Sequence, residues 1–120
     1  MRAARLSVAL LTLALAACGG GTSTDVTRVR DPASVDAGRT LFEANCALCH
    51  GSDLEGGPGD RGGVAPALAT MTGPDDVALI ETIKRGRGLY MPSFGTQLEE
   101  AEIASIVDYI RSVQVTRLGE

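Results

Sequence analysis

Two cysteines and a histidine within five residues constrain this chain more than any other feature of its sequence. They read Cys46-Ala47-Leu48-Cys49-His50, which is the attachment pattern of c-type haem. Two cysteines on one helical turn can add to the two vinyl groups along one edge of a porphyrin. The adjacent histidine is then held beneath the ring, where its imidazole reaches the iron. The pattern predicts one covalently bound haem c, with Cys46 and Cys49 forming thioethers and His50 as an axial iron ligand.

Two other kinds of site use a Cys-x-x-Cys pair, and the rest of the chain favours neither. A thioredoxin-like redox pair lies within a βαβ pattern, and the sequence has no alternation of the kind that marks strands. A zinc site needs further ligands, but there is no second cysteine pair and His50 is the only histidine. Neither alternative explains the histidine that follows Cys49.

The first seventeen residues have the layout of a secretory signal. Arg2 and Arg5 provide a positive start, and residues 6–17 are almost wholly apolar. This apolar stretch is shorter than the ~20 residues that a transmembrane helix needs. We therefore predict that residues 1–17 direct export and are removed.

A cysteine at the end of this stretch predicts lipidation. Leu15-Ala16-Ala17-Cys18 resembles a bacterial lipobox, in which Cys18 carries the lipid and becomes the first mature residue. The alternative is an ordinary signal cleavage that leaves Cys18 as a free thiol. Residues 18–31 have the small, polar composition of a flexible tether, so the expected domains are a signal at 1–17, a lipidated tether at 18–31 and a folded domain at 32–116.

The charge of the mature chain excludes some partners. Of 11 Lys and Arg and 15 Asp and Glu, loss of Arg2 and Arg5 leaves nine against fifteen, a net charge of −6. Such a chain has no electrostatic reason to bind nucleic acid or an anionic bilayer. With two Phe, two Tyr and no Trp, its small core also needs a cofactor to be stable.

Helical spacing of apolar residues predicts an all-α domain. The first helix is expected over 33–48, after Pro32, and a glycine-rich loop follows over 51–66. A second helix begins after Pro74 and ends at Gly86 or Gly88, with an apolar side formed by Val77, Ile80 and Ile83. A turn carries Met91 and Pro92. The last helix is expected over 99–113, with apolar residues at i, i+3, i+4, i+7 and i+10: Ile103, Ile106, Val107, Ile110 and Val113.

These motifs together resemble the class I cytochromes c over residues 33–114. The matching pieces, in order, are Gly38-Arg39-x-Leu41-Phe42, Cys46-x-x-Cys49-His50-Gly51, Pro66-x-Leu68, Met91-Pro92-x-Phe94 and Ile106-x-x-Tyr109-Ile110. The resemblance implies a small all-α fold of three to five helices wrapped around one covalent haem.

The resemblance also implies roles for further residues. Met91 is expected to be the second axial ligand, with Met71 as its competitor, and the Pro66 carbonyl is expected to accept a hydrogen bond from His50. Ala65 stands where family members often carry glycine. Gly38, Phe42 and Tyr109 are expected to form the crossing between the first and last helices. For the basic cluster Lys84, Arg85 and Arg87, three readings stay open: a solvated helix end, a haem propionate partner, or contact with an acidic protein.

The function implied is single-electron transfer by a carrier that is not itself an enzyme. With histidine and methionine on the iron, no position is left for a substrate, and electrons would leave at an exposed haem edge near Cys46 and Cys49. The expected partners are membrane-associated redox proteins in the periplasm, reached from a lipid anchor. Two alternatives remain: a five-coordinate haem enzyme or gas sensor, and a haem subunit fixed within a dehydrogenase or oxidase complex.

Overall fold

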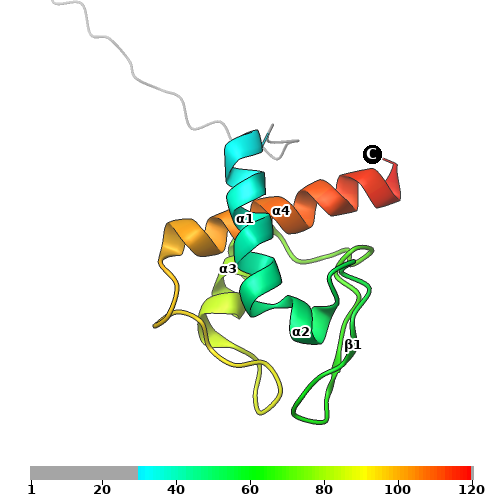
Figure 1. Ribbon diagram of the computed structural model, residues 1–120, viewed down its shortest axis with the longest axis vertical. Helices are drawn as coiled ribbons and strands as arrows, with labels where there is room; N and C mark the ends of the chain where they lie inside the picture. The colour runs from blue at the N-terminus through cyan, green and yellow to red at the C-terminus, as the bar shows by residue number, and fades with distance from the viewer. Residues whose placement is uncertain (1–29, 120) are drawn as a thin grey trace, which may run out of the picture.

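The computed structural model describes residues 30–119, and they form four helices and a short two-stranded ladder that lies beside the second helix at the edge of the domain (Figure 1). The predicted signal at 1–17 and Cys18 lie outside the described residues. The elements are α1 (Pro32–Asn45), α2 (Ala47–His50), β1 (Gly57–Pro58), β2 (Val64–Ala65), α3 (Asp76–Arg85) and α4 (Glu100–Leu118). In Figure 1, α1 crosses α4, whereas α2, the ladder and the loop after α3 lie toward the C-terminal end of α1. The prediction of a small, mainly helical domain is confirmed.

The crossing of α1 and α4 depends on a glycine. A Cβ atom placed on Gly38 would overlap the backbone carbonyl oxygen of Ser105 in α4, so only glycine allows this approach. One turn further along α1, the ring of Phe42 lies 5.5 Å from the ring of Tyr109, tilted by 59°, as aromatic pairs prefer. The predicted roles of Gly38, Phe42 and Tyr109 are confirmed.

The helices begin at residues that can cap them. The Asp31 carboxylate accepts a hydrogen bond from Ala33 N ahead of α1, and the Asp75 carboxylate accepts one from Ala78 N ahead of α3. Helix α4 begins with a reciprocal capping box between Glu99 and Glu102.

The helix boundaries differ from the predictions in two places. The predicted helix over 33–48 is interrupted at Cys46, whose φ and ψ of −120° and −31° end α1 before α2 begins. Helix α4 continues beyond Val113 to Leu118, because its polar residue Gln114 is buried through hydrogen bonds.

The apolar face of α3 and the ladder also depart from the sequence prediction. Val77 was expected on the buried side of the second helix, but it is exposed. Ile83 is buried as predicted, Ile80 is half-buried, and Leu79 is buried although it was not predicted. The antiparallel pairs Gly57–Ala65 and Pro58–Val64 were not predicted, because a two-residue strand is too short to show alternation.

The predicted tether shares its last two residues with the folded domain. Arg30 forms ion pairs with Asp76 and Asp108 at 3.0 and 3.1 Å, and Asp31 caps α1. Along residues 30–119, no helix combines the length and apolar composition that a bilayer crossing requires.

Candidate haem site

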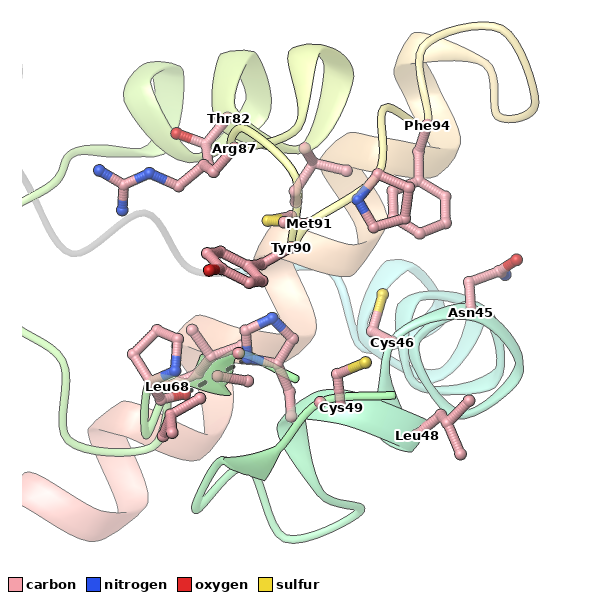
Figure 2. Close-up of a pocket in the computed structure, with 18 of the residues that line it drawn as sticks. Asn45, Cys46, Leu48, Cys49, Leu68, Thr82, Arg87, Tyr90, Met91 and Phe94 are labelled. Carbon is pink, nitrogen blue, oxygen red and sulfur yellow. Dashed lines mark hydrogen bonds between the residues drawn. The ribbon is translucent and has the colours of Figure 1, made fainter. Parts of the chain in front are cut away.

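A cavity of about 380 Å³ opens between α2, the β1–β2 hairpin, α3 and the loop that follows α3. Figure 2 shows side chains from these segments converging on it. Its lining is mainly apolar and includes Leu68, Leu79, Ile83, Phe94 and Ile110. All of the predicted haem-site residues line it as well: Cys46, Cys49, His50, Pro66 and Met91.

The two cysteines lie at one side of the cavity, at the junction of α1 and α2. They do not form a disulfide with one another, and Figure 2 shows their sulfurs next to one another on this side. Burial, followed by the nearby Cys49, raises the pKa of the Cys46 thiol to about 11. The Sγ of Cys49 lies 3.7 Å from an Asp60 carboxylate oxygen on the hairpin.

Hydrogen bonds hold the ring and the backbone of the histidine. Nδ1 of His50 lies 3.3 Å from the Pro66 carbonyl oxygen, and Gly56 N donates a hydrogen bond to the His50 carbonyl at 2.8 Å. Burial lowers the pKa of His50, and the hydrogen bond to Pro66 opposes this in part. A neutral imidazole that donates from Nδ1 keeps the electron pair of Nε2 free for a metal.

The loop that carries Met91 is fastened to the end of α3. Arg87 N donates to the Met91 carbonyl at 2.9 Å, Met91 N donates to the Arg87 carbonyl at 3.3 Å, and Phe94 N donates to the Ile83 carbonyl at 3.1 Å. Gly86 has a φ of +71°, and a Cβ atom there would overlap the Met91 carbonyl. The backbone at Met91 is therefore fixed from both sides.

Met71 lines the same cavity, so it stays an alternative to Met91 for the second axial ligand. Its side chain also packs against the hydrophobic core, and its carbonyl accepts a hydrogen bond from Gln114 at 3.1 Å. Both methionines are thus candidates by position.

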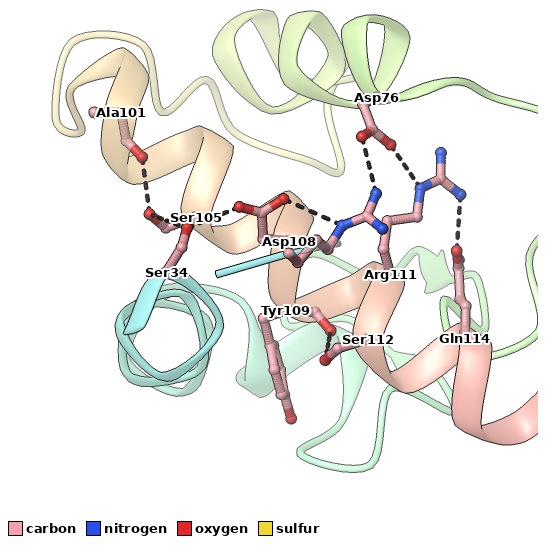
Figure 3. A network of polar contacts seen from close by, with 10 residues as sticks. Ser34, Asp76, Ala101, Ser105, Asp108, Tyr109, Arg111, Ser112 and Gln114 are labelled. Atoms are coloured by element: carbon pink, nitrogen blue, oxygen red, sulfur yellow. Dashed lines mark hydrogen bonds and ion pairs between the residues drawn. The ribbon is translucent and has the colours of Figure 1, made fainter. Parts of the chain in front are cut away.

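A polar network holds the wall of the cavity that contains Leu68 and Met71, and Figure 3 shows the part of it formed by Asp76, Arg111 and Gln114. Gln114 Nε2 donates to the carbonyls of both residues, at 2.7 and 3.1 Å. Arg111 donates to the Gln114 side chain at 2.7 Å and to Asp76 at 2.8 Å. Since the network joins α3 and α4 to the loop, it positions this wall independently of any bound group.

The basic cluster divides into paired and unpaired residues. Lys84 pairs with Glu81 and Glu100, and Arg85 pairs with Glu81. Arg87 instead lines the cavity. The helix-end reading therefore holds for Lys84 and Arg85.

Arg61 and Tyr90 are among the cavity residues that sequence reasoning missed. The Tyr90 ring lies over Gly63 of the hairpin, so close that a Cβ atom on this glycine would clash with it. The one available signal was position: Tyr90 directly precedes Met91, and Arg61 lies in the loop before Pro66.

The donor set of the cavity suits a haem. Two thiols lie on one side, an imidazole and thioethers are present in the lining, and apolar side chains make up most of the rest. The family model described as cytochrome c oxidase, cbb3-type, subunit III matches residues 33–110. The chain belongs to this family of c-type cytochromes.

Relatives and solved structures agree with this assignment. The chain is 35% identical, over 91 residues and 72% of its length, to the cbb3-type cytochrome c oxidase subunit CcoP of Azospirillum brasilense, and spans 30% of that protein. It is similar to cytochrome cL from Methylophaga aminisulfidivorans, with a TM-score of 0.60, 31% identity and coverage of 68% of this chain and 54% of the other. It is also similar to the KustC0563 c-type cytochrome, with a TM-score of 0.55, 30% identity and coverage of 64% and 96%. The cofactor of this cytochrome is covalently bound haem c.

Proposed function

We propose that this cytochrome is a single-electron carrier in which Cys46 and Cys49 form the thioethers and His50 and Met91 are the axial ligands. One observation carries the proposal: these four side chains come from the α1–α2 junction and from the loop after α3, and they line one cavity. Residues that are 45 positions apart in the sequence thus converge where a haem needs them.

Each residue has a defined task in this proposal. His50, oriented through Pro66, offers Nε2 to the iron, and Met91 offers its thioether from the opposing loop. Haem c supplies one-electron chemistry between ferrous and ferric iron. Two axial residues leave no coordination position for a substrate, which favours a carrier over a catalyst. The apolar lining and the methionine favour the reduced state and raise the potential.

Electrons are proposed to cross the rim near the cysteines. Leu48, between the two cysteines, is 80% exposed, and Cys49 lies next to it in α2. A partner that docks on this rim reaches the porphyrin edge without displacing any helix.

The proposed location is the periplasmic face of a membrane, with Cys18 as the lipid anchor. The signal-like residues 1–17 and the lipobox-like Leu15–Cys18 support export and lipidation. Relatives that are cbb3-type oxidase subunits support a membrane redox complex as the partner. A subunit role within such a complex is the second candidate, and stable co-purification with the complex would favour it over a free carrier.

The first experiment tests attachment. Because two thioethers hold the porphyrin, haem colour should stay with the polypeptide through denaturation and acid–organic extraction. The double variant Cys46→Ser/Cys49→Ser should lose the colour and much of its folded structure, since the haem completes the small core. Colour that extracts freely from the wild type would contradict the proposal.

The second experiment tests the axial methionine by comparing Met91→Ala with Met71→Ala. Met91→Ala should abolish the sulfur-to-iron charge-transfer band, lower the potential and open the iron to small ligands. Met71→Ala should keep the band, because Met71 then serves only in packing. The reverse pattern would assign the ligand to Met71.

The third experiment tests the anchor. Cys18→Ser should stop incorporation of labelled fatty acid and should either release haem-loaded protein from membranes or stall as uncleaved precursor. One acyl chain binds a bilayer only marginally, so the wild type should carry more than one. Unlabelled wild-type protein in the soluble fraction would contradict the membrane location.

A further inference from the structure

Ion pairing separates the cavity arginines from every other cationic side chain among residues 30–119. That part of the chain contains eight Lys and Arg residues. Six of them have a carboxylate within 4 Å: Arg30, Arg39, Lys84, Arg85, Arg111 and Arg117. Within the described residues, the two without one are Arg61 and Arg87, and both line the cavity. In a chain rich in carboxylates, unpaired arginines at one cavity indicate that an anion belongs there.

The position of Arg87 is set by its backbone rather than by its side chain. It pairs with Met91 through two backbone hydrogen bonds, at 2.9 and 3.3 Å. The close packing of Gly86 against the Met91 carbonyl fixes the residue before it. Arg87 is therefore held at the cavity without using its guanidinium group.

Figure 2 shows the guanidinium of Arg87 and the hydroxyl of Tyr90 on the side of the cavity away from the sulfurs of Cys46 and Cys49. In a porphyrin of this type the two vinyl groups and the two propionates lie at opposite edges. If the cysteines hold the vinyl edge, the propionate edge faces Arg87 and Tyr90. Propionates are the anionic groups of the molecule, and a guanidinium matches a carboxylate with two parallel hydrogen bonds.

The hairpin explains why Arg61 is the less suitable of the two arginines. Its neighbour Asp60 lies 3.7 Å from the Sγ of Cys49, so this part of the hairpin belongs to the cysteine side. Asp60 also supplies a negative charge next to Arg61 in the chain. Arg87 has its charged neighbours, Lys84 and Arg85, already paired with glutamates.

We propose that Arg87, with the hydroxyl of Tyr90, binds the haem propionates and balances their charge. The proposal rests on the proposed haem function and assigns the one residue of the basic cluster that has no ion pair in the described part of the chain. The positive charge of Arg87 near the haem favours the electron-rich ferrous state, so Arg87 is a residue that sets the potential.

The experiment measures the reduction potential of haem-loaded Arg87→Gln, Arg85→Gln and Arg61→Gln. Each variant removes one positive charge, but Arg85 is paired with Glu81 at 3.0 Å and does not line the cavity. At a fixed ambient potential, Arg87→Gln should raise the ratio of oxidised to reduced protein by about fivefold to tenfold, where tenfold corresponds to 59 mV. Arg85→Gln should change this ratio less than twofold, and Arg61→Gln should lie between the two.

Two further variants and a crystal structure complete the test. Arg87→Lys should restore most of the wild-type potential because it keeps the charge, and Tyr90→Phe should shift the potential in the same direction as Arg87→Gln but less. A crystal structure of the haem-loaded wild type should show a propionate oxygen within 4 Å of the Arg87 guanidinium.

Several results would overturn the proposal. Equal shifts for Arg87→Gln and Arg85→Gln would show an effect of net charge alone, and a larger shift for Arg61→Gln would assign the propionates to the hairpin. A haem-loaded structure with Arg87 turned away from the propionates would also overturn it. Failure of the haem function is distinct, because the wild type would then retain no colour after denaturation.

Discussion

The α1–α4 crossing and the haem cavity are built from the same short chain in opposite ways. At the crossing, Phe42 and Ile106 are at most 1% exposed, and Gly38 brings the two backbones together. At the cavity, Leu48 and Val64 are 80% and 85% exposed, and loops that are held by backbone hydrogen bonds form part of the wall. The crossing buries its own apolar side chains, whereas the cavity side keeps apolar side chains exposed.

This difference predicts where substitutions act. Changes at the crossing should alter the stability of the whole domain, because no other part of the chain can replace that packing. Changes at the cavity should alter the haem environment first and global stability less. Four substitutions test this contrast, in order of decreasing expected effect.

The largest loss is expected for Gly38→Ala. Alanine is the better helix former by about 1 kcal/mol, but the added methyl overlaps the Ser105 carbonyl, and overpacking of this kind costs about 3 kcal/mol. Urea unfolding of the haem-loaded protein should therefore show a net loss of about 2 kcal/mol or more. The exposed Thr40→Ala in the same helix should stay within about 0.5 kcal/mol. A stabilised Gly38→Ala would mean that the crossing is not closely packed.

Gln114→Leu removes the donor that links the two regions. The carbonyls of Leu68 and Met71 lose their partner, and unsatisfied buried groups cost about 1–3 kcal/mol. We expect a loss of about 2 kcal/mol in urea unfolding, together with weaker haem-pocket absorption features because this wall loosens. Gln97→Leu, at an exposed position, is the control. An equal loss of stability in both variants would show that the Gln114 hydrogen bonds do not stabilise the domain.

Gly86→Ala tests whether a glycine is also required at the cavity, where Gly86 packs against the Met91 loop. A positive φ costs alanine about 1 kcal/mol, and the contact with the Met91 carbonyl adds displacement of the ligand loop. Gly88 also has a positive φ, of 57°, but an added Cβ there meets no atom within 4 Å. Gly88→Ala should lose about 1 kcal/mol and Gly86→Ala somewhat more because of its contact with the Met91 carbonyl, and only Gly86→Ala should weaken the methionine-to-iron absorption band. Loss of the band in Gly88→Ala would show that general loop strain, not the Gly86 contact, controls Met91.

The smallest effect is expected for Asp76→Asn, and it depends on pH. Burial raises the pKa of Asp76, but the hydrogen bond from Arg111 and the charges of Arg30 and Arg111 outweigh it and hold this pKa below its ordinary value. A carboxyl with a lowered folded-state pKa stabilises the protein above its unfolded pKa of about 4, and this contribution is lost as the pH falls through the folded value. In urea unfolding, the wild type should have a larger free energy of unfolding than Asp76→Asn at pH 7. The difference between the two proteins should be smaller at pH 3. The exposed Asp36→Asn should show no such change, and a pH-independent difference would remove the ion pairs as its cause.

The parts of the fold that sequence predicted are those with local signals. The apolar spacing of Ile103, Ile106 and Ile110 predicted α4 and its buried face, and the Cys-x-x-Cys-His pattern predicted haem c as the cofactor. Prediction failed where burial or pairing depends on residues that are distant in the sequence. The burial of Gln114 depends on carbonyls 43 and 46 residues away, so the end of α4 could not be read from its own residues. Likewise, only the pairing of Lys84 and Arg85 with glutamates distinguishes Arg87 from its neighbours.

Helix α1 connects the end of the predicted tether to the haem cavity. Arg30 and Asp31 are bound to the domain at its first turn, and Cys46 lines the cavity at its last. Fourteen residues at 1.5 Å per residue span about 21 Å. If Cys18 is lipidated as proposed, this helix is a rigid spacer between the tether and the cysteines that hold the haem. With the predicted flexible tether between Cys18 and this helix, the redox edge would reach partners whose docking surfaces stand clear of the headgroups as well as partners close to the bilayer.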